Sequence, residues 1–336
     1  MKTIYRLAAV ALLAICSISI AQPARSQDRP LKFVMASTPS FTWLPFLVAR
    51  NVTFDALQRE IGRPIDVTYS PTTTPAILGI IAGDYDFGIA YVQHAIKAQA
   101  EGKDLVVLLA MMDSPTAALV VRSDLTDIQS PKDLKGKAVG VVGLGSGHHM
   151  IGLAVADANG LAADDVTYRA TGGIAGWIPS LRGKRVDALI ASEPTLSRIL
   201  DEGLGRILVD FHDRATTEKV FKGPHPTVAL IARREYIEAN PKIVQAVVTA
   251  HMNALKWIGQ KKPQEILAVL PEELKKQQGV EKILERVLPA VSNNGVTAPE
   301  AVTITGKWLQ EMGEIPAQAK IEPAKVIDDR FRRAAQ

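Results

Sequence analysis

The stretch DVTY at residues 66–69 recurs unchanged at residues 165–168, about one hundred residues further along the chain. After each copy come a helical stretch, a glycine and an aspartate-led apolar segment, DFGIA at residues 86–90 and DALIA at residues 187–191. Short apolar runs bounded by turn residues are typical of buried strands. The repeated order of elements therefore predicts two similar halves.

A further buried strand is predicted upstream of each copy, at residues 31–35 and at residues 137–142. Each runs into a loop rich in Gly, Ser, Thr and Pro and then into a helical pattern. Alternating strands and helices predict parallel sheets with right-handed crossovers. We therefore expect an α/β fold of two lobes.

The C-terminal part of the chain is predicted to be helical after one last strand at residues 227–231. Asn240 is a suitable N-cap, and Pro241 suits the first position of a long amphipathic helix. Thr297 and Glu300 have the spacing of a capping box. Further helices are predicted from Pro263, from Val280 and after Thr297. We expect this helical tail to pack on the first lobe.

The N-terminus has the pattern of a secretory signal peptide. Lys2 and Arg6 precede an uncharged apolar run at residues 7–20, which is shorter than the roughly 20 residues that span a bilayer. Cleavage is expected after Ala21 or after Ser26. The sequence thus predicts export to the periplasm.

The only cysteine, Cys16, lies inside this apolar run and follows Ile15, where a lipoprotein signal has a small residue. We therefore expect no lipid anchor and a mature chain without cysteine. Such a chain has neither disulfides nor cysteine nucleophiles, so its core alone must stabilise it.

The predicted organisation places the signal peptide at residues 1–26, the first lobe at residues 27–115 and 224–336, and the second lobe at residues 116–223. The chain is expected to cross between the lobes near residues 113–118 and again near residues 214–226.

Charge excludes some partners. Without residues 1–26 the chain keeps 36 of its 39 basic residues against 35 acidic ones, and no Lys/Arg-rich run stands out. Nucleic acid and anionic membranes are recognised by basic patches. We expect neither as a partner.

Open α/β sheets bind ligands beyond the carboxyl ends of their strands. Six loops are predicted there, and they are rich in hydroxyls, glycines and aromatics. They are STPSFTW at residues 37–43, SPTTT at 70–74, AY at 90–91, GLGSGHH at 143–149, TGG at 171–173 and SEP at 192–194.

The segment Gly145-Ser146-Gly147 is a candidate anion site, because glycines let backbone amides approach a ligand and a helix is predicted to start there. It is not a nucleotide loop. Met150 breaks the pattern G-x-G-x-x-G, and no lysine follows as a P-loop requires.

Several of these motifs, in this order, resemble one family. They are PFLVA at residues 45–49, DLKGK at 133–137, VG at 139–140, GSG at 145–147, the turn from Gly183 to Asp187, and Glu193-Pro194. Over residues 31–260 the chain resembles the periplasmic binding proteins of ABC transporters for nitrate, taurine and sulfonates, the NMT1/THI5-like proteins.

The resemblance implies a type II periplasmic-binding fold, whose two lobes close on one small ligand, and delivery of that ligand to a permease in the inner membrane. The expected ligand is anionic or zwitterionic, of the sulfonate, taurine, carboxylate or nitrate type. We expect a monomer without a cofactor. Together with the anion site, the implied ligand contacts are Ser37, Thr38, Phe41, Thr42, Trp43, Ser70, Thr72, Tyr91, Gly145, Ser146, Gly147, His148, Gly172 and Glu193.

Some of these residues also have structural interpretations. His148 and His149 can be helix-capping residues, and no second pair at metal-ligand spacing accompanies them. Glu193 can bond to neighbouring loops or to a ligand amine. Trp43 and Tyr91 can be core aromatics or a stacking wall for a ligand.

An enzyme on the same fold is the alternative function, since fold does not determine function. Related pyrimidine-synthesis enzymes carry a cysteine-rich motif, which this sequence lacks. A cleft hydrolase would need His148 or His149 beside a serine such as Ser146, with an acid to orient the histidine. A sensor domain that presents the ligand to a receptor is a third possibility. We expect a binding protein and not an enzyme.

Overall fold

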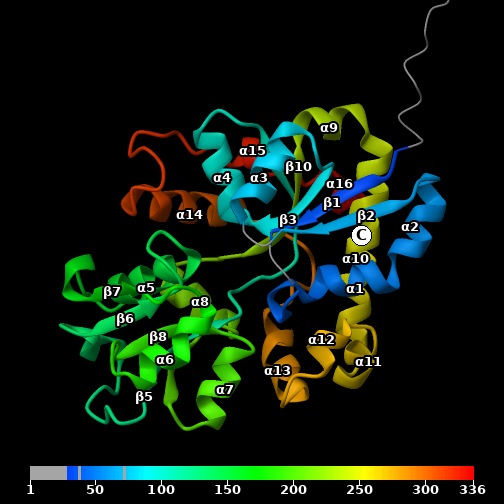
Figure 1. Cartoon of the computed structure of the whole chain (residues 1–336). Coiled ribbons are helices and arrows are strands. Elements are labelled where there is room, and N and C mark those ends of the chain that lie inside the picture. Colours follow the sequence, from blue (N-terminus) through cyan, green and yellow to red (C-terminus); the bar gives the residue numbers. More distant parts are fainter. Residues whose placement is uncertain (1–28, 37–38, 71–72) are drawn as a thin grey trace, which may run out of the picture.

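The computed structural model describes residues 29–36, 39–70 and 73–336, so the predicted signal peptide lies outside the described residues. The chain forms two five-stranded sheets, and helices pack on both faces of each sheet (Figure 1). The predicted α/β fold of two lobes is confirmed.

The first sheet has the strand order β2-β1-β3-β10-β4. Its strands are β1 Leu31–Met35, β2 Ile65–Tyr69, β3 Phe87–Tyr91, β4 Leu105–Ala110 and β10 Val228–Arg233. Phe33 of β1 lies opposite Val67 of β2 and Phe87 of β3, in parallel pairing. β10 pairs antiparallel with both of its neighbours.

The second sheet repeats this arrangement in the order β7-β6-β8-β5-β9. Its strands are β5 Ala117–Arg122, β6 Ala138–Val141, β7 Thr167–Ala170, β8 Ala188–Ser192 and β9 Gly205–Asp210. β6 pairs in parallel with β7 and β8, and β5 pairs antiparallel with β8 and β9. The two DVTY copies thus lie at corresponding edges of the two sheets.

The prediction of purely parallel sheets is wrong for one strand in each sheet. The antiparallel strands β5 and β10 are the first strands after each crossing between the lobes. The parallel strands end where the sheets face each other, so a strand that enters from the other lobe begins at that end and runs the opposite way.

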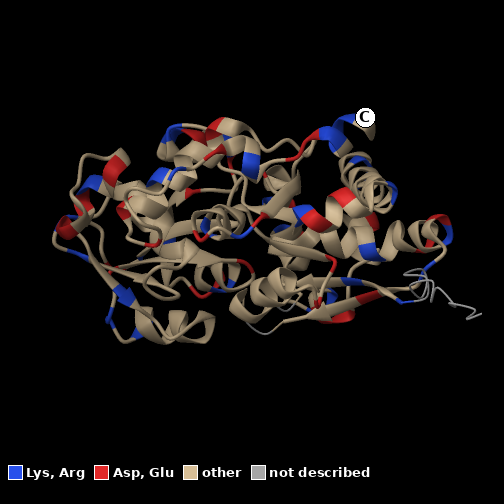
Figure 2. Ribbon diagram, turned by 90° about the horizontal axis from the view of Figure 1, so that it is seen from above, with Lys and Arg blue, Asp and Glu red and all other residues tan. Residues whose placement is uncertain are grey.

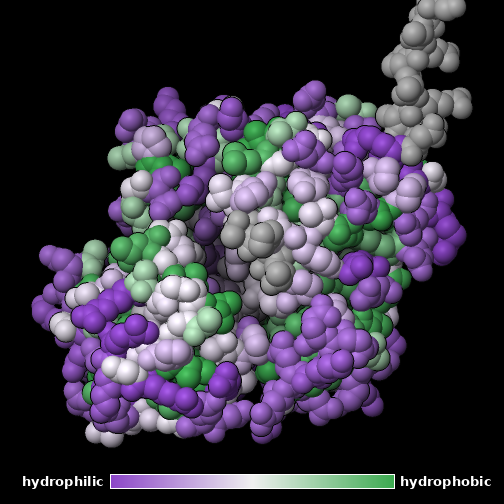
Figure 3. Space-filling view, in the orientation of Figure 1, coloured by the Kyte–Doolittle hydropathy of each residue, from purple (hydrophilic) through white to green (hydrophobic). Residues whose placement is uncertain are grey.

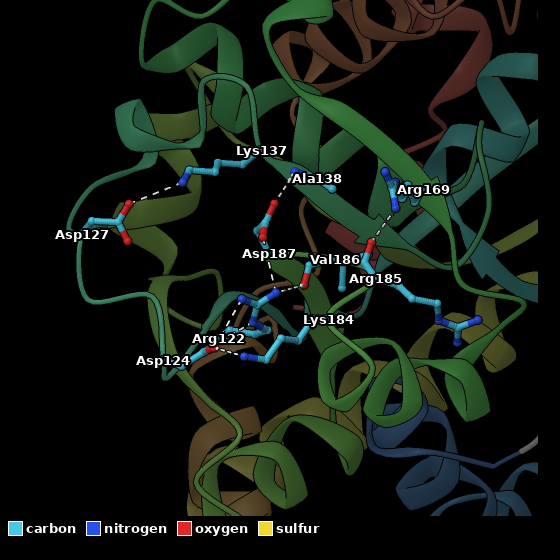
Figure 4. A network of polar contacts seen from close by, with 10 residues as sticks. All are labelled: Arg122, Asp124, Asp127, Lys137, Ala138, Arg169, Lys184, Arg185, Val186 and Asp187. Carbon is cyan, nitrogen blue, oxygen red and sulfur yellow. Dashed lines mark hydrogen bonds and ion pairs between the residues drawn. The ribbon is translucent and has the colours of Figure 1, made fainter.

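The aspartates of the two echoed segments bind the neighbouring strand. Asp86 accepts a hydrogen bond from Lys32 N at 2.9 Å and pairs with Arg29. In the second lobe, Asp187 accepts from Ala138 N at 2.9 Å and lies 3.4 Å from Arg122 Nη1 (Figure 4). Both carboxylates therefore join the start of one strand to the next and have structural roles.

Helices of the first lobe are divided between the two faces of its sheet. They are α1 Leu44–Val52, α2 Phe54–Ile61, α3 Thr73–Ala82 and α4 Val92–Ala100. In β10, Val228, Leu230 and Ala232 face the α1 and α2 side, whereas Ala229 and Ile231 face the α3 and α4 side. This alternation buries both faces of the sheet.

The second lobe has the same layers. Its helices are α5 Gly147–Ala158, α6 Trp177–Arg182, α7 Thr195–Asp201 and α8 Arg214–Phe221. α5 and α8 cover one face of the sheet, with Leu119 beneath them, and α6 and α7 cover the other, with Val120.

The C-terminal part is helical, as predicted. It contains α9 Arg234–Ala239, α10 Pro241–Gln260, α11 Pro263–Ala268, α12 Glu272–Lys275, α13 Val280–Val287, α14 Pro299–Glu311, α15 Pro323–Val326 and α16 Arg330–Ala334. Asn240 takes the N-cap position of α10, but its side chain donates to Tyr236 O at 3.0 Å. The predicted capping box at Thr297 is wrong, because α14 starts at Pro299 with Ala298 as its N-cap.

Most of this tail packs on the first lobe, and α14 contacts both lobes. Val302 and Leu309 belong to the core beside α3 and α4, while Trp308 belongs to the core beside α5 and α8 (Figure 1). A helix that packs on both lobes joins them on one side of the space between the two sheets.

The chain passes from the first sheet to the second between β4 and β5, and returns between α8 and β10. The boundaries expected at 115/116 and 223/224 fall within these two connections, and we propose them as the limits of the lobes.

Lys and Arg residues are interspersed with Asp and Glu over both lobes (Figure 2). Among the residues that the structure describes, no helix is both long enough and apolar enough to cross a membrane.

Candidate functional site

A cavity of about 560 Å³ lies between the two lobes, where the surface is hollowed (Figure 3). It is placed at the ends of β3, β6 and β8, where the fold class predicts a ligand. The first lobe contributes Thr73, Thr74, Tyr91, Val92, Gln93, His94, Lys97, Thr305 and Glu314. The second lobe and the two connections contribute Pro115, Thr116, Ala117, Val142, Leu144, Gly145, Ser146, Gly147, His148, Met150, Ile151, Ile174, Ser192, His225, Pro226 and Thr227.

The start of α5 forms one edge of the cavity. Gly145 has a φ of +77°, which an L side chain rarely adopts, and it turns the chain into the helix. Ser146 is the N-cap, and its Oγ accepts from His149 N at 3.3 Å. The amides of Gly147 and His148, in the first turn, have no acceptor within the helix. They are therefore available to an anion in the cavity.

His149 stabilises this turn by a hydrogen bond to its backbone. Its Nδ1 accepts a hydrogen bond from Gly145 N at 3.0 Å, and its ring contacts Tyr168 edge-on at 4.8 Å. The predicted capping interpretation thus describes His149 better than a metal-binding one. Within the described parts of the chain, no group of three or more His, Cys, Asp and Glu residues could hold a metal ion.

His148 points to a different partner from the serine considered in the hydrolase alternative. Its Nε2 lies 2.9 Å from Ser192 Oγ, at the end of β8, and its ring packs on Trp177. Burial lowers the pKa of His148 to about 4, so the imidazole is neutral near neutral pH. No carboxylate within the described residues is bonded to this ring.

Two more histidines line the cavity, and both are neutral. Burial lowers the pKa of His94 to about 4, with a smaller effect of Lys97. Burial also lowers the pKa of His225 to about 3. The His225 ring stacks on Phe221 at 3.7 Å, and its Nδ1 lies 3.4 Å from Thr305 Oγ1 of α14.

Tyr91 ends β3 and borders the cavity beside His94. Its ring contacts Trp43 edge-on at 5.4 Å, and burial raises its pKa to about 12. The phenol therefore stays protonated and can donate a hydrogen bond to a ligand.

An ion pair crosses one side of the cavity. Lys97 Nζ of α4 lies 2.6 Å from Glu314 Oε2, which follows α14. A Cβ added to Gly145 would lie only 2.1 Å from Glu314 Oε1, so this carboxylate reaches the loop before α5. The sequence analysis missed both residues, because they are far apart in the chain and belong to no local motif.

Other predicted contacts are not among the residues that line this cavity. Phe41 and Trp43 are buried in the core of the first lobe, and Thr42 Oγ1 bonds at 2.8 Å to Oγ1 of Thr116, which does line the cavity. Ser70 is buried at the end of β2, and Gly172 lies in the turn after β7. Ser37, Thr38 and Thr72 lie outside the described residues.

Glu193 is also buried and joins the two lobes. Its carboxylate accepts from Ser197 N and from Ser197 Oγ, both at 3.1 Å. Its Oε1 lies 2.7 Å from Arg286 Nη1 of α13, which packs on the first lobe. With these partners it has the structural role that the sequence left open beside ligand binding.

A protein-family model described as "NMT1/THI5 like" matches residues 64–266. No curated protein matches the chain. A solved structure of a protein from Bordetella bronchiseptica RB50 is 26% identical, with a TM-score of 0.75, over 92% of this chain and 97% of that one.

Two solved structures of sulfonate-binding proteins have the same fold. The putative periplasmic sulfonate-binding protein SsuA of Methylobacillus flagellatus KT is 19% identical, with a TM-score of 0.73, over 92% of this chain and 94% of its own. The periplasmic aliphatic sulphonate binding protein SsuA of Escherichia coli is 20% identical, with a TM-score of 0.69, over 91% of this chain and 99% of its own.

Proposed function

Because the chain belongs to the NMT1/THI5-like family, we propose that it is the solute-binding component of an ABC importer. In this proposal it binds a small ligand with an anionic group between its lobes in the periplasm and delivers it to a membrane permease. The sulfonate-binding proteins that share its fold support this role. Sulfonates, carboxylates, taurine and nitrate are the ligand types to test.

The observation that carries the proposal is the composition of the cavity. Both lobes contribute to it, and the free first-turn amides of α5 lie at its edge. A ligand that contacts both lobes favours the closed arrangement by its differential affinity for the two states. Ser146 and the amides of Gly147 and His148 would bind the anionic group, with Tyr91 as a further donor.

The enzyme alternative has less support. His148 and Ser192 meet in the cavity, but burial keeps the pKa of His148 low and no acid among the described residues is bonded to its ring. A weakly basic imidazole is a poor general base for a serine nucleophile.

Thermal unfolding of residues 27–336 with a panel of sulfonates, carboxylates and nitrate tests the proposal. A ligand that binds only the native state stabilises it by about 2.7 kcal/mol at 100 times its dissociation constant. We expect one anionic class to raise the unfolding midpoint and to be recovered unchanged. Consumption of a compound would favour an enzyme, and stabilisation by neutral compounds alone would exclude the anion site.

Replacing Ser146 tests the position of the anionic group. Asp and Asn are both good N-caps, so S146D and S146N should keep α5 folded. We expect S146D to lose affinity for the anion through like-charge repulsion, by about tenfold or more, whereas S146N should stay within about threefold of the wild type. Equal affinities of the two variants in titration calorimetry would contradict the assignment.

A further inference from the structure

Lys97 and Glu314 are the lysine and the glutamate that line the cavity, and within the described chain no Asp, Arg or further Lys or Glu lines it. Their side chains are 30% and 24% exposed, and they pair at 2.6 Å. With the cavity histidines neutral, the charges of the lining cancel. The ammonium of Lys97 is therefore already compensated before any ligand arrives.

The second carboxylate oxygen of Glu314, Oε1, has a different environment from Oε2. Oε2 accepts from Lys97, whereas Oε1 lies against Gly145, and no donor in the described residues is bonded to it. This oxygen can still accept a hydrogen bond. It lies beside the start of α5, where the proposed function places the anionic group of the ligand.

Two negative groups at this edge would repel each other. A cationic group between them replaces the repulsion by two attractions, and an ammonium also supplies the donor that Oε1 lacks. A simple anion has no such group, so it leaves Oε1 of Glu314 without a donor from the described residues or from the ligand.

We propose that Glu314 is a specificity-determining residue, which binds a cationic N–H donor group of the ligand through Oε1. The ligand is then a compact zwitterion, with its anionic group at the Gly147 and His148 amides and its ammonium at Glu314. This inference rests on the proposed function, because it assumes an anionic group at the start of α5.

Matched ligand pairs test the inference by titration calorimetry on residues 27–336. Taurine is compared with ethanesulfonate and β-alanine with propanoate, since the members of each pair differ in the amino group. We expect the wild type to prefer the amino compound of at least one pair by about tenfold or more. E314Q should lose most of this preference, because it keeps the shape of the side chain and removes its charge.

Glu311 provides a matched control. It is an exposed glutamate on α14 that lies 3.5 Å from Lys307 and does not line the cavity, so E311Q should keep the preference of the wild type. If E314Q does not fold, the comparison of the matched ligand pairs on the wild type tests the inference by itself.

Each outcome has one meaning. Equal binding of amino compound and simple anion by the wild type, or an undiminished preference in E314Q, would overturn the role of Glu314 and leave the proposed function intact. Failure of every anion and zwitterion to bind would overturn both.

Discussion

His251 is a polar residue in the hydrophobic core. It is 1% exposed and lies among the rings of Phe33, Phe46 and Phe54 in the core of the first lobe. Its Nδ1 lies 2.8 Å from Val247 O, and its Nε2 is buried without a partner among the described residues. Burial therefore lowers its pKa from 6.5 to about 4.

This residue makes folding sensitive to acid. The folded pKa lies below the unfolded one, so the unfolded chain binds the proton first as the pH falls below 6.5. His251 alone should cost about 2 kcal/mol of unfolding free energy between about pH 7 and about pH 5. Leucine at this position cannot titrate. We therefore expect H251L to lose less unfolding free energy than the wild type over the same pH range, as measured by urea unfolding at both pH values. Parallel losses in the two proteins would show that His251 does not contribute.

At the scale of elements, α13 and the loop before α7 form a contact between the lobes. The Glu193 side chain is 1% exposed, and Arg286 is its partner from the other lobe. Removal of Arg286 leaves the buried carboxylate of Glu193 with the hydrogen bonds from Ser197 as its remaining contacts among the described residues.

We expect R286Q to lower the unfolding free energy by about 2 kcal/mol, below the value for a fully buried pair because Arg286 is partly exposed. It should also weaken ligand binding, since a contact that joins the two lobes is lost. The exposed pair of Arg198 with Glu202 is the control, and R198Q should cost clearly less than R286Q because solvent screens an exposed pair. Urea unfolding of the two variants checks the difference, and equal costs would argue against a buried inter-lobe contact.

The elements that the sequence predicted well depend on local patterns. The strands β1, β3, β6 and β8 are short apolar runs with turn residues at their ends, and the start of α5 follows from the GSG segment. The antiparallel direction of β5 and β10 was not predicted, because it depends on the end of the sheet at which the chain enters from the other lobe, and no local pattern records that end. The capping box at Thr297 failed because proline at position 299 suits N1, which makes Ala298 the N-cap.

The same limit applies to the candidate site. His148 meets Ser192 across 44 residues of sequence, and Lys97 meets Glu314 across 217. Each pair lies within one lobe and exists only once that lobe is folded. For Trp43 the sequence left two interpretations open, a core aromatic or a wall of the site, and only the folded structure shows that the side chain is buried in the core.

At the scale of the whole molecule, several contacts join the lobes. Glu314 reaches Gly145 at the edge of the cavity, Glu193 pairs with Arg286, and Trp308 packs into the core of the second lobe. The cavity exists because the lobes are held against each other. Its ligand should therefore stabilise both lobes together.

Hydrogen–deuterium exchange of residues 27–336, with and without the tightest ligand of the unfolding panel, tests whether a small anionic or zwitterionic ligand binds between the lobes. We expect slower exchange in three separate segments, residues 91–97, 145–151 and 225–227, which line the cavity from the first lobe, the second lobe and the return connection. Protection confined to one lobe, or centred on the separate cavity at residues 239–246 beside the start of α10, would contradict it.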